Sequence, residues 1–211
     1  MSYAIHKQTY AEGQAYRYHL LDEAEHLRYV AERTGLLFPS PTRLVEFFDP
    51  DHNPVGRLQP PDTAPWQRGK RYEVFICNEG EEAEEPHAVI REQWRPVDVL
   101  LLRLPCYEVQ LGEYRYTAQG SRYGERFYEI FRPRGEGGAS EETGADEEIG
   151  EDEEGHEPQE MKVGQIQRPT IGPDYIVETD AAPLRQAPLV LAALVILIDM
   201  DLCSGERLLP R

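Results

Sequence analysis

An uncharged apolar run near the C-terminus constrains the fold of this chain more than any other segment. Residues 187–198, APLVLAALVILI, are twelve residues without a charge, and Asp199-Met-Asp201 follows at once. As a helix the run is about 18 Å long, whereas a bilayer core needs roughly 20 apolar residues. No side of such a helix is polar, so it must be buried on every side. We therefore expect the core of a folded domain and no integral membrane insertion.

Short segments that alternate apolar and polar residues precede this run, and a period of two is typical of half-buried strands. Turn residues separate the segments, as in the DPDHNP sequence of residues 49–54. About twelve to thirteen strands with so little helix favour a β-sandwich or a barrel. The predicted strands are 3–9, 16–21, 26–31, 43–48, 55–58, 71–77, 88–93, 99–102, 106–111, 114–117, 126–131, 162–167 and 174–178.

We treat residues 1–211 as one domain, because no Pro/Gly linker separates two self-sufficient halves. The helix is predicted over 183–203, and its start is open. Asp180 is a candidate cap for a start nearby, but Pro188 would then kink the helix interior. A start at Pro188 puts proline in the permitted first turn. The predicted buried core of the helix is Leu189, Leu191, Leu194, Val195 and Ile198.

The net charge of −17 is concentrated in one segment. Of the 39 acidic residues, 12 lie between residues 135 and 160, where there is no Lys or Arg. Such a composition buries too little apolar surface to fold, which predicts a disordered acidic insertion. The rest of the chain has 27 acidic and 22 basic residues and no basic face, which excludes nucleic-acid binding. The three Cys have no CxxC motif and no paired spacing, and no secretory signal is visible, which favours the cytoplasm.

No catalytic constellation is visible. The six histidines lack metal-binding spacing, and GSRYG at 120–124 is better explained as a hairpin loop than as a nucleophile elbow. We therefore predict a protein that is not an enzyme and has no cofactor or metal. Asp174, Glu178 and Asp180 match no calcium-loop pattern, and a turn with a helix cap is the favoured interpretation over a calcium-responsive segment.

Four features of the chain can be compared with a known family. They are the order of the hairpins, the Asp-x₆-Gly hairpin from Asp49 to Gly56, a late Tyr-x-Val strand and the ending LVLAALVILID at 189–199. In these features the chain resembles the LURP-one-related proteins. These belong to the tubby C-terminal-like superfamily, which also contains the phospholipid scramblases. The resemblance implies a closed antiparallel barrel of about twelve strands around a central hydrophobic C-terminal helix. It implies a non-enzymatic binding or scaffold domain with an unknown protein or lipid ligand. The alternative is a scramblase-like protein attached to the membrane through its apolar helix.

Tubby domains recognise phosphoinositide headgroups, which requires a basic pocket. Arg68, Lys70 and Arg71 are the candidates for lipid headgroup contact, and the alternative for them is a solvated strand edge. Asp199 opposes the helix dipole near the helix end, so it needs a basic or hydrogen-bonding partner. We interpret it as a helix-end anchor at the barrel mouth, with ligand binding there as the alternative.

Overall fold

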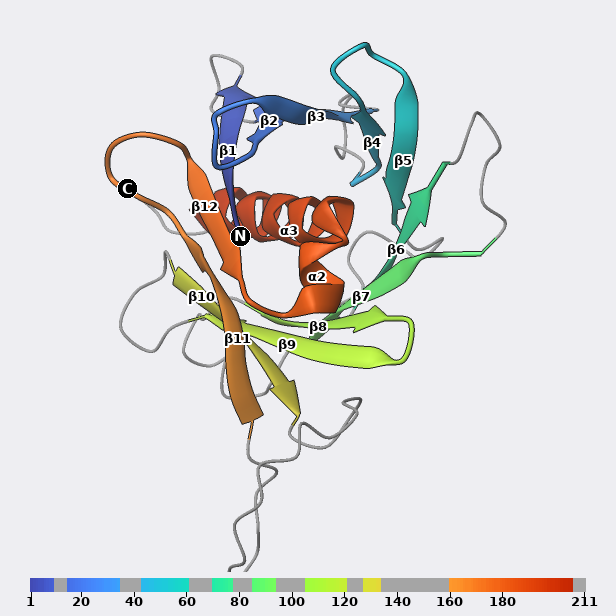
Figure 1. Cartoon of the computed structure of the whole chain (residues 1–211), viewed down its shortest axis with the longest axis vertical. Coiled ribbons are helices and arrows are strands. Elements are labelled where there is room, and N and C mark those ends of the chain that lie inside the picture. Colours follow the sequence, from blue (N-terminus) through green and yellow to red (C-terminus); the bar gives the residue numbers. More distant parts are fainter. Residues whose placement is uncertain are drawn as a thin grey trace, which may run out of the picture.

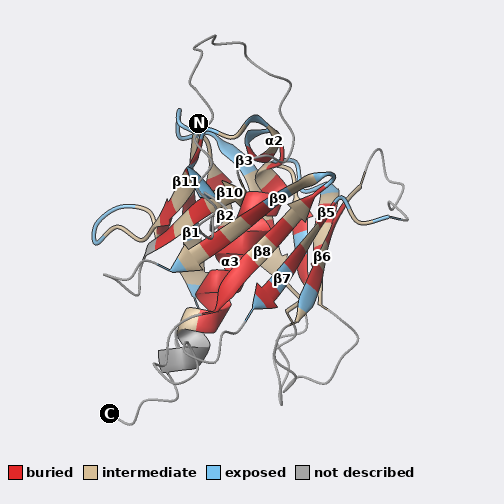
Figure 2. Ribbon diagram, turned by 90° about the horizontal axis from the view of Figure 1, so that it is seen from below, coloured by how far each residue is buried: buried red, intermediate tan, exposed pale blue. Residues whose placement is uncertain are grey.

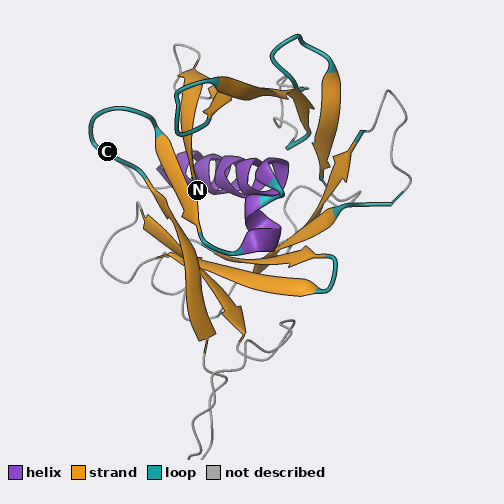
Figure 3. Cartoon of the chain, in the orientation of Figure 1, coloured by secondary structure: helices purple, strands orange, loops and turns teal. Residues whose placement is uncertain are grey.

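Twelve antiparallel strands close into one barrel. The computed structural model describes residues 1–9, 15–34, 43–60, 70–77, 85–93, 105–120, 127–133 and 160–206. Each strand pairs with its neighbours in the chain, and β1 pairs with β12 to close the ring (Figures 1 and 3). The strands are β1 (Ser2–Thr9), β2 (Ala15–Leu21), β3 (Leu27–Arg33), β4 (Val45–Phe48), β5 (Pro54–Gln59), β6 (Arg71–Ile76), β7 (Ala88–Gln93), β8 (Cys106–Leu111), β9 (Tyr114–Gly120), β10 (Phe127–Pro133), β11 (Glu160–Gln167) and β12 (Tyr175–Thr179).

The predicted fold class, a mainly β closed barrel with a hydrophobic C-terminal helix, is confirmed. Twelve of the predicted strands coincide with observed strands to within a few residues. The predicted strand at 99–102 and nearly all of the predicted acidic insertion lie outside the described residues. Glu160, which we assigned to the insertion, is the first residue of β11.

The helix α3 (Pro188–Glu206) lies inside the ring of strands (Figure 1). Every residue from Leu189 to Asp201 has an exposed fraction of 9% or less, and the helix is red through the gaps between the strands in Figure 2. Strand residues that point inward and the helix form one continuous apolar core. A helix that is apolar on all sides is stable only where every side is covered, and the closed barrel supplies that cover.

We predicted one helix over 183–203, but the observed helical segment is divided in two. A single turn, α2 (Ala182–Arg185), precedes α3, and the two meet near Ala187. Pro188 has no N–H to donate, and its ring would clash with the carbonyl of residue 184 in a continuous helix. The second of our two starts is therefore the correct one for the long helix. The cap of α2 is Ala181, without a side-chain hydrogen bond, so the expectation that Asp180 caps the helix is wrong.

Gly56 of β5 lies where the start of α3 approaches the barrel wall closely. A Cβ at this position would lie 2.5 Å from the Phe75 carbonyl oxygen and 3.2 Å from Leu189 Cδ1. Only glycine allows so close an approach of two strands and a helix.

Candidate functional site

The two carboxylates of α3 are the only acidic residues of the helix among the side chains that the structure describes, and both are buried. Asp199 is 1% exposed and accepts three hydrogen bonds. Its Oδ1 accepts from Lys7 Nζ at 2.9 Å and from the Tyr175 hydroxyl at 2.6 Å, and its Oδ2 accepts from the Tyr18 hydroxyl at 2.9 Å. We call these four residues the Asp199 cluster.

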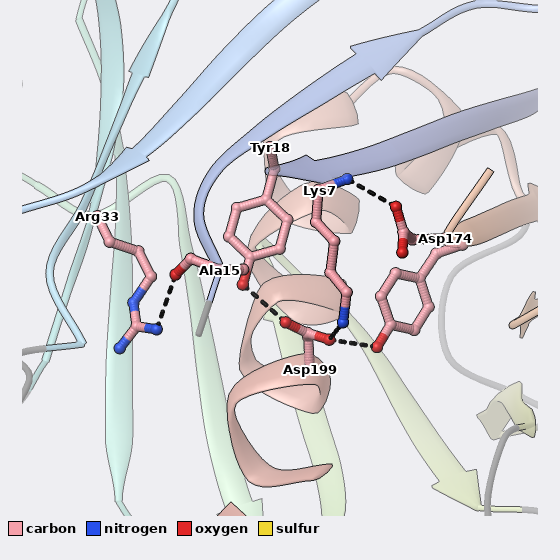
Figure 4. A network of polar contacts seen from close by, with 7 residues as sticks. Lys7, Ala15, Tyr18, Arg33, Asp174 and Asp199 are labelled. Carbon is pink, nitrogen blue, oxygen red and sulfur yellow. Dashed lines mark hydrogen bonds and ion pairs between the residues drawn. The ribbon is translucent and has the colours of Figure 1, made fainter. Parts of the chain in front are cut away.

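The strands hold the members of the Asp199 cluster in place, as Figure 4 shows. Lys7 extends from β1 toward the helix, and its backbone N–H donates to Asp174 Oδ2 at 2.8 Å. On the far side of Tyr18, the Arg33 guanidinium donates to the Ala15 carbonyl at 3.1 Å, which ties β3 to the start of β2. The ammonium of Lys7 is thereby held beside a carboxylate that has almost no contact with water.

Asp201 has a cluster of its own, which consists of Asp201, Arg43, Tyr72 and Tyr107. Its Oδ1 accepts from the Arg43 guanidinium and its Oδ2 from the Tyr107 hydroxyl. Arg43 also donates to the Tyr72 hydroxyl at 2.8 Å. Each buried carboxylate therefore has one cationic partner and at least one tyrosine, which is the arrangement that offsets the cost of burying a charge.

The two clusters face opposite walls of the barrel. Residues two apart in an α-helix point about 200° from each other around the axis. The Asp199 cluster draws on β2, β1 and β12, which are consecutive in the ring, and the Asp201 cluster includes β6 and β8, which flank β7. In the ring of twelve strands β7 lies directly across from β1. The same turn of α3 is thus joined by ion pairs to both sides of the barrel.

Burial keeps Tyr18, Tyr72 and Tyr107 protonated. The pKa of the Tyr18 hydroxyl is raised well above its usual value, first by burial and then by the negative charge of Asp199. Burial and Asp201 raise the pKa of Tyr107 in the same way. Burial alone would lower the pKa of Arg43, but Asp201 and Tyr72 beside it raise the pKa overall. These groups are fixed hydrogen-bond donors, since none of them is poised to exchange a proton near neutral pH.

Sequence reasoning singled out Asp199 but missed Asp201 and every partner of the two carboxylates. The partners are Lys7, Tyr18, Arg43, Tyr72, Tyr107 and Tyr175. A signal was present in part, because the sequence contains 12 Tyr and several of them occupy inward positions of alternating strands. Which tyrosine reaches which carboxylate depends on barrel closure, which the sequence pattern does not give.

Lys70 and Arg71, the two candidate lipid contacts that the structure describes, are not brought together on one face. Arg71 is exposed at the start of β6 and pairs with Glu73 at 3.0 Å. Lys70 immediately precedes β6, and the pKa of its ammonium is lowered by burial and by Arg43, which places it toward the Asp201 cluster. Arg68 lies outside the described residues. Lys70 and Arg71 therefore point to opposite sides of the wall, as successive strand residues do.

The three acidic residues before the helix take up separate positions. Asp174 accepts from the Lys7 backbone, Glu178 accepts from Gln165 Nε2 at 2.6 Å, and Asp180 donates its backbone N–H to the Val163 carbonyl at 3.0 Å. Across the described ranges, no three or more His, Cys, Asp or Glu side chains are gathered as metal ligands.

An open pocket of about 510 Å³ lies beside β11 and the end of β12, near the point where the chain turns into α2. Its lining includes Met1, Glu23, Lys162 and Asp180. It is at the other end of the barrel from the two carboxylate clusters, because β12 runs from Tyr175, in the Asp199 cluster, to Thr179, in the pocket wall.

Comparison of the chain with models of protein families, with curated proteins and with solved structures found no match. In the part of the chain that the structure describes, no helix is both long enough and apolar enough to cross a bilayer.

Proposed function

We propose that this chain is a non-enzymatic binding or scaffold domain of the tubby C-terminal-like kind, related to the LURP-one-related proteins. The supporting observation is the architecture itself, a closed barrel of twelve antiparallel strands that encloses its own C-terminal helix. Asp199 and Asp201 of that helix both accept hydrogen bonds from protein donors, which favours a structural over a catalytic use of them.

The filled interior determines where a ligand can bind. In barrels that carry small molecules the lumen is open, but here the inward side chains of the strands pack on α3. A partner must therefore bind at an end of the barrel or on its outer wall. The pocket beside β11 and β12 is one such place.

The direct test is native mass spectrometry of the protein purified from its own cells without detergent. We expect a stoichiometric lipid, small molecule or protein to accompany the chain. A chain that is recovered alone at physiological salt, and from which cross-linking in those cells also captures nothing, would contradict the proposal.

Lipid headgroup recognition by Arg68, Lys70 and Arg71 is a narrower form of the same proposal. Its test is flotation with vesicles that contain phosphoinositides, using a variant with all three changed to Ala. A matched control changes Arg28, Arg115 and Arg185 to Ala; these three are exposed elsewhere on the molecule, so the same charge is removed. If the two triple variants and the wild type float equally, headgroup contact at this site is eliminated.

Attachment to a membrane through α3 is the competing hypothesis, and the burial of Leu189 to Asp201 argues against it, because insertion would empty the barrel of its core. A cytoplasmic location is part of our proposal and agrees with the free thiol of Cys77. Fractionation tests both ideas together. Recovery in a carbonate-resistant membrane pellet would overturn the buried-helix proposal.

A further inference from the structure

Two histidines on the outer wall of the barrel belong to none of the clusters described above. His6 of β1 and His19 of β2 are direct partners in the antiparallel register. The adjacent pair, Ile5 and Leu20, is buried in the core, so the two imidazoles project from the opposite, outer face. His6 is exposed and His19 is half-buried.

We propose that His6 and His19 form a binding site for one divalent transition-metal ion. Side chains directly opposite in antiparallel strands have Cβ atoms about 4.5–5.5 Å apart, which allows both rings to reach a shared ion. Imidazole nitrogen suits Zn²⁺, Cu²⁺ and Ni²⁺, and water completes the coordination. No third His, Cys, Asp or Glu joins them in the described ranges, so two imidazoles are the ligand set. This site is independent of the proposed binding or scaffold function.

The surroundings of the pair are compatible with a cation. Arg17 lies on the same outer face, but Glu32 of β3 draws its guanidinium away, with a distance of 2.6 Å between Nη2 and Oε1. Asp174 lies on the other side of β1, where its carboxylate accepts the Lys7 backbone N–H.

Rigidity favours two-point binding. Five consecutive pairs join β1 to β2, from Ala4↔Leu21 to Gln8↔Arg17, and the histidine pair lies inside this ladder. The second imidazole is thus already in position when the first has bound, and effective concentrations of this kind raise affinity by about 10²–10⁴-fold over one ligand.

The test is a titration of the full-length protein with Zn²⁺ alone, followed by calorimetry and by the imidazole signals in NMR spectra. The first equivalent should shift the signals of His6 and His19 together. His6→Gln and His19→Gln should each raise the Kd about a hundredfold or more, and the double variant should leave no binding at this site. His87→Gln is the matched control, since it removes an exposed histidine elsewhere and should leave the Kd unchanged.

The proposal is overturned if the wild-type spectra show only one of the two signals shifting, or if either single variant binds Zn²⁺ within twofold of wild type. Because the wild-type spectra test the site without any substitution, a variant that misfolds does not remove the test. Melting temperatures within a few degrees of wild type, measured without metal, establish that the variants are comparable.

Discussion

The Lys7–Asp199 ion pair gives the sharpest test of how α3 is held in the barrel. Its two side chains are 12% and 2% exposed, and 2.9 Å separates Lys7 Nζ from Asp199 Oδ1. Asp199→Asn removes the negative charge but keeps an oxygen for the tyrosine hydroxyls. It leaves the Lys7 ammonium without its counter-ion in a nearly dry site. Removal of one partner of a buried pair costs about 3–5 kcal/mol. Since Lys7 retains some contact with water, we expect about 3 kcal/mol.

The chain contains a matched control for burial. Lys162 and Glu129 form the same kind of pair at 2.8 Å, but their side chains are 44% and 33% exposed. A solvent-exposed pair contributes about 0–1 kcal/mol, so Glu129→Gln should cost no more than that. The difference between the two variants isolates the effect of burial, because the chemistry and the distance are nearly the same.

The assay is urea unfolding, with the midpoint and slope fitted for each protein, together with thermal unfolding. A loss of 3 kcal/mol corresponds to a fall in Tm of about 6–12 °C for a chain of this size. Lys7→Met combined with Asp199→Asn removes both charges and should recover more than half of the loss, because no unpaired charge remains. An Asp199→Asn protein that melts at the wild-type temperature, or two single effects that simply add, would refute the anchor role of Asp199.

Three further predictions concern the core and pH. Gly56→Ala should destabilise the fold by about 1–3 kcal/mol in urea titrations, because the added Cβ meets the Phe75 carbonyl; equal stability would mean that the close approach is unimportant. Leu194→Ala, in the middle of the buried helix, should cost about 2–5 kcal/mol, and a cost below 1 kcal/mol would place the helix outside the core. The raised pKa values of Tyr18 and Tyr107 mean that the folded state holds these protons more tightly than the unfolded state. The contribution of these two tyrosines to stability should therefore be fully present below pH about 10 and fall as the pH rises above it. The tyrosinate absorbance of the buried tyrosines should appear together with unfolding. Tyrosinate absorbance from all the tyrosines before the protein unfolds would contradict this.

Much of the barrel could be predicted because its signals are local. Period-two alternation identified twelve strands, and the apolar run 187–198 predicted a helix buried on all sides. The end of the helix was predicted less well, since α3 continues to Glu206. Its start was ambiguous because a proline is compatible with either a first turn or a break. The tertiary structure contains a break at Ala187, where α2 turns the chain into the barrel.

The candidate site was predictable only at Asp199, and its partners were not. Lys7 and Tyr175 are 168 positions apart in the chain and meet only because β1 closes the ring against β12. A charge that must be compensated is visible in a sequence, but the residue that compensates it is chosen by strand register. Lys70 and Arg71 show the converse, since they are adjacent in sequence and on opposite sides of the wall.

The sequence by itself determined that this chain buries an apolar helix under many short strands, because hydrophobic period and charge placement act over a few residues. The tertiary structure decided where that helix sits and what holds it. Closure of the ring brought Lys7 and Arg43 to two carboxylates that point to opposite walls, and it set His6 beside His19 on the outer face. These choices depend on long-range pairing and register, whose free energy comes from contacts between residues that are distant in the chain.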